Sequence, residues 1–241
     1  MSSSLRVVVN ADDFGRSVEV TDAIVRCLDA GSVTSTTVMA TAPDFARSME
    51  LAPRFQQVSF GVHLTATEFA PLRSDRRLSP IMTDGAFDPA KRANFRKPSV
   101  LRALLEEWSA QFESVAEFVP VSHADSHHLV HWRPELMPVV SALVRRHNIR
   151  CLRTATKYGA SGALAAKRRL WRATARGLSG AVMTDDFGTL RDFVIDIDRW
   201  GQSGSSIELG VHPGHPGYAA ESELLDQAWR KASQRPIELI S

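Results

Sequence analysis

The chain has 241 residues, of which 44% are hydrophobic and 23% are charged, as in an ordinary globular protein. Its formal net charge of +2 argues against a polyanion-binding surface, so we expect no nucleic-acid partner. Because no segment approaches the ~20 apolar residues of a membrane span and none resembles a signal peptide, we expect a cytoplasmic protein.

Strand-like and helical segments alternate in the first quarter of the chain. The β-branched run at Val7–Val9 predicts a buried strand that ends in the polar motif Asn10–Gly15. Apolar residues at three- and four-residue spacing predict a helix from Val20 to Leu28, and Gly31 lies where a C-terminal cap belongs. The segments that follow are a strand at 36–40, a short helix at 44–51 and a strand at 58–64.

Residues 65–98 differ from the rest of the chain, because they hold four prolines and mixed charges without a clear period. An irregular stretch of this length inside a compact domain is usually functional or disordered. We interpret it as a loop that covers the active site.

Regular segments return after residue 98. They are a helix at 101–115, a strand at 119–124, a helix at 134–144, a strand at 149–152, a helix at 164–175, strands at 181–184 and 207–211, a helix at 224–232 and a strand at 237–240. This alternation predicts an α/β fold with about seven parallel strands and outer helices, as a barrel or an open sheet. Acids replace the glycines that a dinucleotide site needs after the first strand, and no linker is visible, so we expect a single domain over 1–241.

Polar residues fall where the predicted strands end. In a parallel α/β fold these ends share one face, where the active site is built, so residues far apart in sequence are expected to meet there. The residues concerned are Asp12, Asp13, His63, Asp125, His127, Arg153 and His212.

Two histidines and one carboxylate suit a divalent ion and leave coordination positions open for water and substrate. Two adjacent carboxylates, Asp12 and Asp13, are explained if one binds the ion while the other acts as a base. Without a cation, the two groups would repel each other and raise each other's pKa values.

Each of these residues also has a purely structural interpretation. Asp12 and Asp13 could form a turn or a helix cap, and a single histidine such as His63 is more often a hydrogen-bonded structural residue. The repeated His-Pro-Gly of 212–217 is typical of a rigid turn. The combination of these residues at strand ends favours a functional site.

Five motifs, in this order and spacing, resemble the YdjC-like carbohydrate deacetylases, a family that includes chito-oligosaccharide deacetylases. The resemblance covers nearly the whole chain. The pairing of Asn-Ala-Asp-Asp-Phe-Gly with Gly-Val-His-Leu is highly specific, whereas His-Pro-Gly alone would be weak. The motifs are Asn10–Gly15, Thr34–Met39, Gly61–Thr65, Asp125–His128 and His212–Gly214.

This resemblance implies a distorted (β/α) barrel with a single divalent metal ion, commonly zinc or magnesium. By the family pattern, the metal ligands are Asp13, His63 and His127.

The same pattern makes Asp12 the general base and His212 a candidate general acid, while Arg153 matches an arginine that would orient Asp12. The chain departs from the family at Leu129, where a second histidine is usual. A strand-like backbone would place Leu129 on the same side as His127, so we expect an altered substrate or weaker activity.

The resemblance implies removal of an acetyl group from an N-acetylated sugar. Two alternatives stay open: hydrolysis of another amide or of a phosphoester at the same site, and a non-catalytic, metal-containing sugar-binding protein. The metal, the sugar and the oligomeric state, a homodimer included, are not determined by the sequence.

Overall fold

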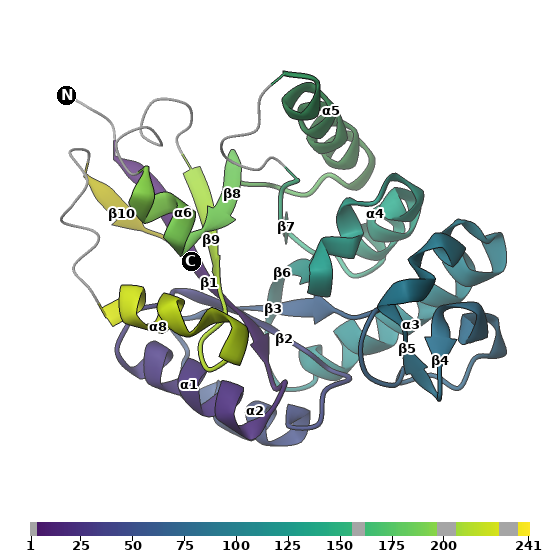
Figure 1. The fold of residues 1–241 in the computed structure, drawn as a ribbon, viewed down its shortest axis with the longest axis horizontal. Coiled ribbons are helices and arrows are strands. Elements are labelled where there is room, and N and C mark those ends of the chain that lie inside the picture. The colour runs from purple at the N-terminus through teal and green to yellow at the C-terminus, as the bar shows by residue number, and fades with distance from the viewer. Residues whose placement is uncertain (1–3, 156–161, 197–205, 227–235) are drawn as a thin grey trace.

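One parallel sheet, curled into a half-barrel with helices outside it, forms the centre of the protein (Figure 1). The computed structural model describes residues 4–155, 162–196, 206–226 and 236–241. The strand order is β7-β6-β3-β2-β1-β9-β8, and β10 pairs with the beginning of β1. The strands are β1 (Leu5–Phe14), β2 (Ser35–Val38), β3 (Ser59–Leu64), β6 (Val121–Ser126), β7 (Cys151–Leu152), β8 (Asp186–Thr189), β9 (Ser206–Val211) and β10 (Ile237–Leu239). The expected α/β fold with about seven parallel strands is confirmed.

Helices of the described residues surround this sheet (Figure 1). Their bounds are α1 (Val18–Asp29), α2 (Phe45–Leu51), α3 (Pro98–Ala116), α4 (Met137–Arg146), α5 (Gly162–Ser179), α6 (Leu190–Ile195) and α8 (Ala219–Asp226). The helix α6 was not expected from the sequence, and residues 227–232 of the helix expected at 224–232 lie outside the described residues.

The two faces of the central strand β1 have different chemistry. Val7 and Val9 are fully buried on the face toward the helices, where β1 contacts α1. Helix α1 begins at the cap Ser17, whose hydroxyl accepts a hydrogen bond from Val20, and it buries Ile24 and Leu28 as its apolar spacing predicts.

The inner face of the half-barrel is polar, unlike the apolar interior of a packed barrel. Asn10 of β1 accepts a hydrogen bond from Ser35 of β2 and donates one to Thr37. His123 of β6 lies against Gly61 of β3, where an added Cβ would come within 2.4 Å of the imidazole ring. These buried polar groups hydrogen-bond to one another across the strands, so the interior can hold charged residues.

The expected strand at 181–184 is wrong in its position. Val182 forms an isolated bridge with Cys151 of β7, and the ladder with β9 begins only at Asp186. The sequence Asp-Phe-Gly-Thr of β8 was missed because Asp and Gly are disfavoured in strands. Pairing with β9 and burial of Phe187 outweigh that preference.

The long segment after β3 contains short regular pieces. These are η2 (Arg76–Ile81), β4 (Met82–Thr83), β5 (Ala86–Phe87) and η3 (Pro89–Arg96). Both short helices pack on α3, and β4 and β5 form a hairpin of their own. Residues close to β3 reach the polar inner face, as described below, while the covering role of the segment stays a prediction.

Candidate metal centre

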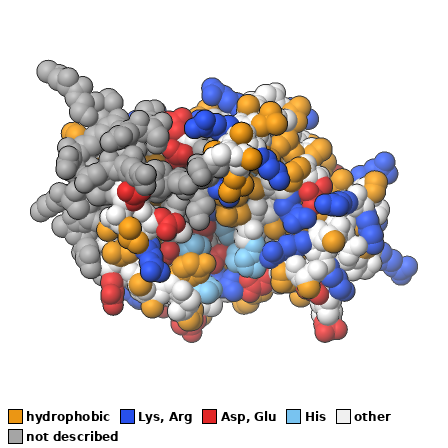
Figure 2. Space-filling model, turned by 45° about the horizontal axis from the view of Figure 1, so that its top comes forward, with side chains coloured by type: hydrophobic (Ala, Val, Ile, Leu, Met, Phe, Trp, Pro, Cys, Tyr) orange, Lys and Arg blue, Asp and Glu red, His pale blue; other side chains and the backbone are white. Residues whose placement is uncertain are grey.

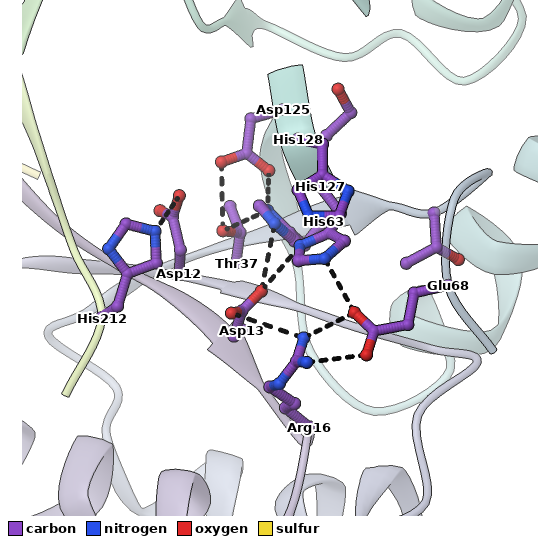
Figure 3. A network of polar contacts seen from close by, with 12 residues as sticks. Asp12, Asp13, Arg16, Thr37, His63, Glu68, Asp125, His127, His128 and His212 are labelled. Atoms are coloured by element: carbon purple, nitrogen blue, oxygen red, sulfur yellow. Dashed lines mark hydrogen bonds and ion pairs between the residues drawn. The ribbon is translucent and has the colours of Figure 1, made fainter. Parts of the chain in front are cut away.

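A kink in β1 turns two adjacent carboxylates toward the same site. In a regular strand, neighbouring side chains point to opposite faces. Asp13 has a φ of 72°, and the pairing of β1 with β2 shifts register between Ala11 and Phe14. A left-handed conformation is costly for a residue with a Cβ, and such strain is concentrated at functional sites. The kink lets Asp12 and Asp13 share the inner face (Figure 3).

Asp13, His63 and His127 converge on one point, as the sequence predicted. Oδ1 of Asp13 lies 3.3 Å from Nε2 of His63 and 3.2 Å from Nδ1 of His127. All three side chains are buried, and one ligand atom from each lies within 4.8 Å of the others. They come from β1, from β3 and from the residue after β6 (Figure 3).

This donor set fits a divalent ion. Among the described residues, Oδ1 of Asp13 is a buried oxygen that makes no hydrogen bond. A buried, unpaired carboxylate oxygen is costly, and a cation between it and two imidazole nitrogens would satisfy it. The three residues are therefore suited to hold a metal ion.

The far nitrogen of each histidine faces a second carboxylate. Nδ1 of His63 lies 2.6 Å from Asp125, and Nε2 of His127 lies 2.9 Å from Glu68. Arg16 donates two hydrogen bonds to Glu68, at 2.7 and 2.8 Å. Carboxylates in this position fix the ring orientation and tautomer of metal-binding histidines. The arrangement leaves the near nitrogens of both rings directed toward Asp13.

The charges around the rings show how strongly this site favours a cation. Burial lowers the pKa of His63, but Asp125 and then Asp13 outweigh it and raise that pKa to about 10. Burial likewise opposes the charged form of His127, while contacts with Asp13 and Glu68 raise its pKa. The excess negative charge in the site is what a bound metal ion would neutralise.

A second set of three residues, Asp12, His63 and Asp125, also lies within 4.8 Å. Both of its carboxylates are already paired with the guanidinium of Arg153. A cation there would have to replace or oppose that buried positive charge. The set around Asp13 is therefore the better candidate for the metal.

Arg153 joins three buried carboxylates beneath the candidate metal centre. It donates two hydrogen bonds to Asp12, at 2.6 and 2.7 Å, and one to Glu208 at 2.6 Å, and it lies 2.7 Å from Asp125. Asn10 donates a further bond of 2.7 Å to Asp12. Burial raises the pKa of Glu208 to about 7, against the opposing effect of Arg153. The structure therefore brings the predicted orienting arginine into contact with the predicted base.

His212 lies on the other side of Asp12 from the candidate metal centre (Figure 3). It follows β9 directly, and its Nε2 is 3.8 Å from Oδ2 of Asp12. Glu221 accepts a hydrogen bond of 2.8 Å from the backbone N–H of His212 and lies 3.3 Å from its Nδ1. The six residues predicted for the site thus meet at one end of the sheet.

The expected strand-like position of Leu129 beside His127 is wrong. The chain does not continue as a strand after Ser126, because residues His127–Trp132 form a short 3-10 segment. His128 and Leu129 have φ values of 55° and 53°, so Leu129 does not lie in strand-like alternation with His127. The consecutive left-handed residues instead turn the chain at the edge of the site, where His128 is exposed.

Sequence reasoning missed Glu68, Thr37 and Glu208. Glu68 lies in the irregular segment after β3, where nothing in the local pattern distinguishes it from other charged residues. Thr37 donates a hydrogen bond to Asp125; it lies in the family motif Thr34–Met39, which assigned it no role. The position of Glu208 inside a strand with apolar neighbours was the one available signal for a buried charge.

The site reaches the surface. Histidine side chains, in pale blue, gather in the lower central part of the face shown in Figure 2, beside blue Lys and Arg side chains. The side chain of His212 is 21% exposed and that of Glu68 is 31% exposed. The site is therefore partly open to solvent at these two side chains.

A parallel α/β half-barrel with two imidazoles and two carboxylates at its strand ends defines a candidate metal-dependent hydrolase. The chain belongs to the YdjC-like protein family, whose model matches residues 6–239. The carbohydrate deacetylase of Brevibacillus brevis is 30% identical over 98% of this chain and 90% of its own length.

Other relatives match over part of their length. The carbohydrate deacetylase of Vibrio vulnificus strain CMCP6 is 35% identical, over 60% of this chain and 57% of its own length. A crystal structure from Enterococcus faecalis V583, provisionally named a cellobiose-phosphate cleavage protein, is 24% identical over 98% of both chains with a TM-score of 0.79. This likeness supports the fold. None of the described helices is long and apolar enough to span a bilayer.

Proposed function

We propose that the protein is a metal-dependent hydrolase that removes the acetyl group from an N-acetylated sugar. The observation that carries the proposal is that Asp13, His63 and His127 meet at one point. Asp12 lies beside them and is not one of the three proposed metal ligands. The carbohydrate deacetylases named among its relatives support the substrate class.

The roles of the first three residues follow from their donor atoms. Asp13, His63 and His127 would hold the ion, and the carboxylates behind the two rings would keep them oriented. When bound, a divalent ion polarises a carbonyl and lowers the pKa of a bound water. Two imidazoles favour zinc over magnesium, which prefers oxygen ligands.

Asp12 and His212 would carry the protons. Asp12 takes a proton from the water that attacks the acetyl carbon, and His212 donates a proton to the amine nitrogen as the C–N bond breaks. The products are acetate and a free amino sugar. Nε2 of His212 and Oδ2 of Asp12 lie 3.8 Å apart, so the two groups are close enough to reach atoms bound to the same acetyl carbon.

Arg153 would keep Asp12 in place. Its two hydrogen bonds to Asp12 fix the plane of the carboxylate, and because Asn10 also donates to Oδ1, the lone pair that stays available for a proton is on Oδ2. The buried guanidinium also contacts Asp125 and Glu208. Positioning of the base is thus separated from binding of the ion.

Acetate release tests the proposal. The purified protein is incubated with defined N-acetylglucosamine oligomers and with a panel of phosphoesters, and its metal content is measured on the same sample. We expect acetate release that depends on the bound metal. Phosphate release without acetate would establish the phosphoesterase alternative, and saturable sugar binding without acetate at any metal supplementation would establish a binding protein.

A further inference from the structure

The turn that carries His212 is fixed against helix α1. Gly214, two residues further on, has a φ of 77°. A Cβ at this glycine would lie 2.7 Å from Cβ of Ala23 and 2.8 Å from the carbonyl oxygen of Glu19. Because only a glycine fits so close to α1, the backbone at His212 has little freedom to move away from the site.

The imidazole of His212 is held on two sides. Tyr218 stacks on it, with ring centroids 4.1 Å apart and planes at 18°. Glu221, which is 5% exposed in the first turn of α8, meets both the backbone N–H and Nδ1 of the same histidine. These contacts leave Nε2 as the ring atom directed toward Asp12.

We propose that Glu221 is a positioning residue for the general acid: it binds the Nδ1–H group of His212, so that Nε2 is the atom that delivers the proton. The activity test of this proposal rests on the proposed deacetylase function. The structural test depends only on the contacts of His212. Tyr218 assists by holding the ring plane.

The surrounding charges favour the protonated ring. Burial opposes the charged form of His212, but the hydrogen bond that His212 donates to Glu221 and the charges of Asp12, Glu221 and Asp13 raise its pKa. His215, on the same turn, is a basic neighbour of His212, and the pKa of His215 is lowered by burial. An acid that must still hold its proton near neutral pH benefits from this arrangement.

The structural readout is nuclear magnetic resonance of the histidine rings in wild type and in Glu221→Gln. The signal of His212 is assigned by its loss in His212→Gln. In wild type we expect the neutral ring to carry its proton on Nδ1. Removing a charge at this distance should lower the pKa of His212 by about one unit in Glu221→Gln. An unchanged pKa and tautomer would overturn the proposal.

The activity readout uses the pH profile of acetate release. In Glu221→Gln the alkaline limb of the pH profile of kcat should move to lower pH by about one unit. At pH values above this limb kcat should be about 10-fold lower than in wild type, while KM should not change. Glu221→Asp should restore part of the shift. Glu223→Gln, an exposed change on the same helix, should match wild type. Equal losses at every pH would contradict the proposal.

Two features keep these outcomes separable. Glutamine can still accept the backbone N–H of His212, so Glu221→Gln should fold, as circular dichroism and the thermal midpoint will show. If wild type releases no acetate from any sugar, the proposed function fails. The resonance experiment still decides whether Glu221 sets the pKa and tautomer of His212.

Discussion

Arg153, which follows β7, donates a hydrogen bond to each carboxylate oxygen of Asp12 near the end of β1. In the sequence, 140 residues lie between the two positions. Both side chains are buried, and the same guanidinium also contacts Asp125 and Glu208. This contact therefore stabilises the polar interior and also holds the proposed base in position.

Replacing Arg153 should destabilise the protein strongly. Arg153→Met leaves three buried carboxylates without their cation, so we expect the free energy of unfolding to fall by about 3–5 kcal/mol. Urea denaturation measures it. Arg146→Met removes an exposed arginine that pairs with Glu106 and should change stability by less than about 1 kcal/mol. A small effect at Arg153 would mean that the carboxylates are held by other groups.

Asp12→Asn should separate catalysis from metal binding. The amide keeps the shape of the side chain and cannot take a proton from water, so kcat should fall by about 10²–10⁴. The metal content of the purified variant should equal that of wild type, because Asp12 is outside the proposed ligand set. Full turnover in this variant would remove Asp12 from the mechanism.

Loss of one metal ligand should abolish binding and the stability that binding supplies. With free metal at 100 times Kd, a bound ion stabilises the folded state by about 2.7 kcal/mol, and a chelator should remove this gain in wild type. In His63→Ala and His127→Ala the thermal midpoint should no longer respond to metal or chelator. Elemental analysis provides the direct check, and unchanged metal in both variants refutes the ligand set.

Glu68→Gln should weaken metal binding without removing it. Glu68 touches His127 rather than the ion, and loss of such a partner typically costs 10–100-fold in affinity. Calorimetric titration with zinc measures the change. Glu106→Gln is the control, because Glu106 is partly exposed on α3 and pairs with Arg146. Equal affinities in Glu68→Gln and wild type would assign Glu68 a purely structural role.

Glu208 should make stability depend on pH. Its folded pKa of about 7 exceeds the ordinary value of 4.5, so the folded state retains a proton that the unfolded state has lost between these pH values. The free energy of unfolding should therefore fall as pH rises from about 4.5 to 7, by at most ~1.4 kcal/mol per pH unit. Comparison of urea denaturation in wild type and Glu208→Gln across this range isolates the effect. Parallel curves would show that Glu208 titrates normally.

The sequence by itself determined the alternation of strands and helices, because apolar periodicity reports directly which face of each element is buried. It also placed the polar motifs at strand ends, and parallel pairing brings such ends to one face. Asp13, His63 and His127 could therefore be placed among the polar residues expected to meet at one face. The resemblance to the family then selected these three as the metal ligands.

Only the tertiary structure decided how these side chains are aimed. The left-handed conformation of Asp13 reverses the strand alternation and cannot be read from an aspartate in the sequence. Glu68 and Glu208 act through contacts between distant segments, and their local patterns carry no trace of those partners. Local periodicity fixes which residues are buried, whereas long-range pairing fixes which buried charges meet.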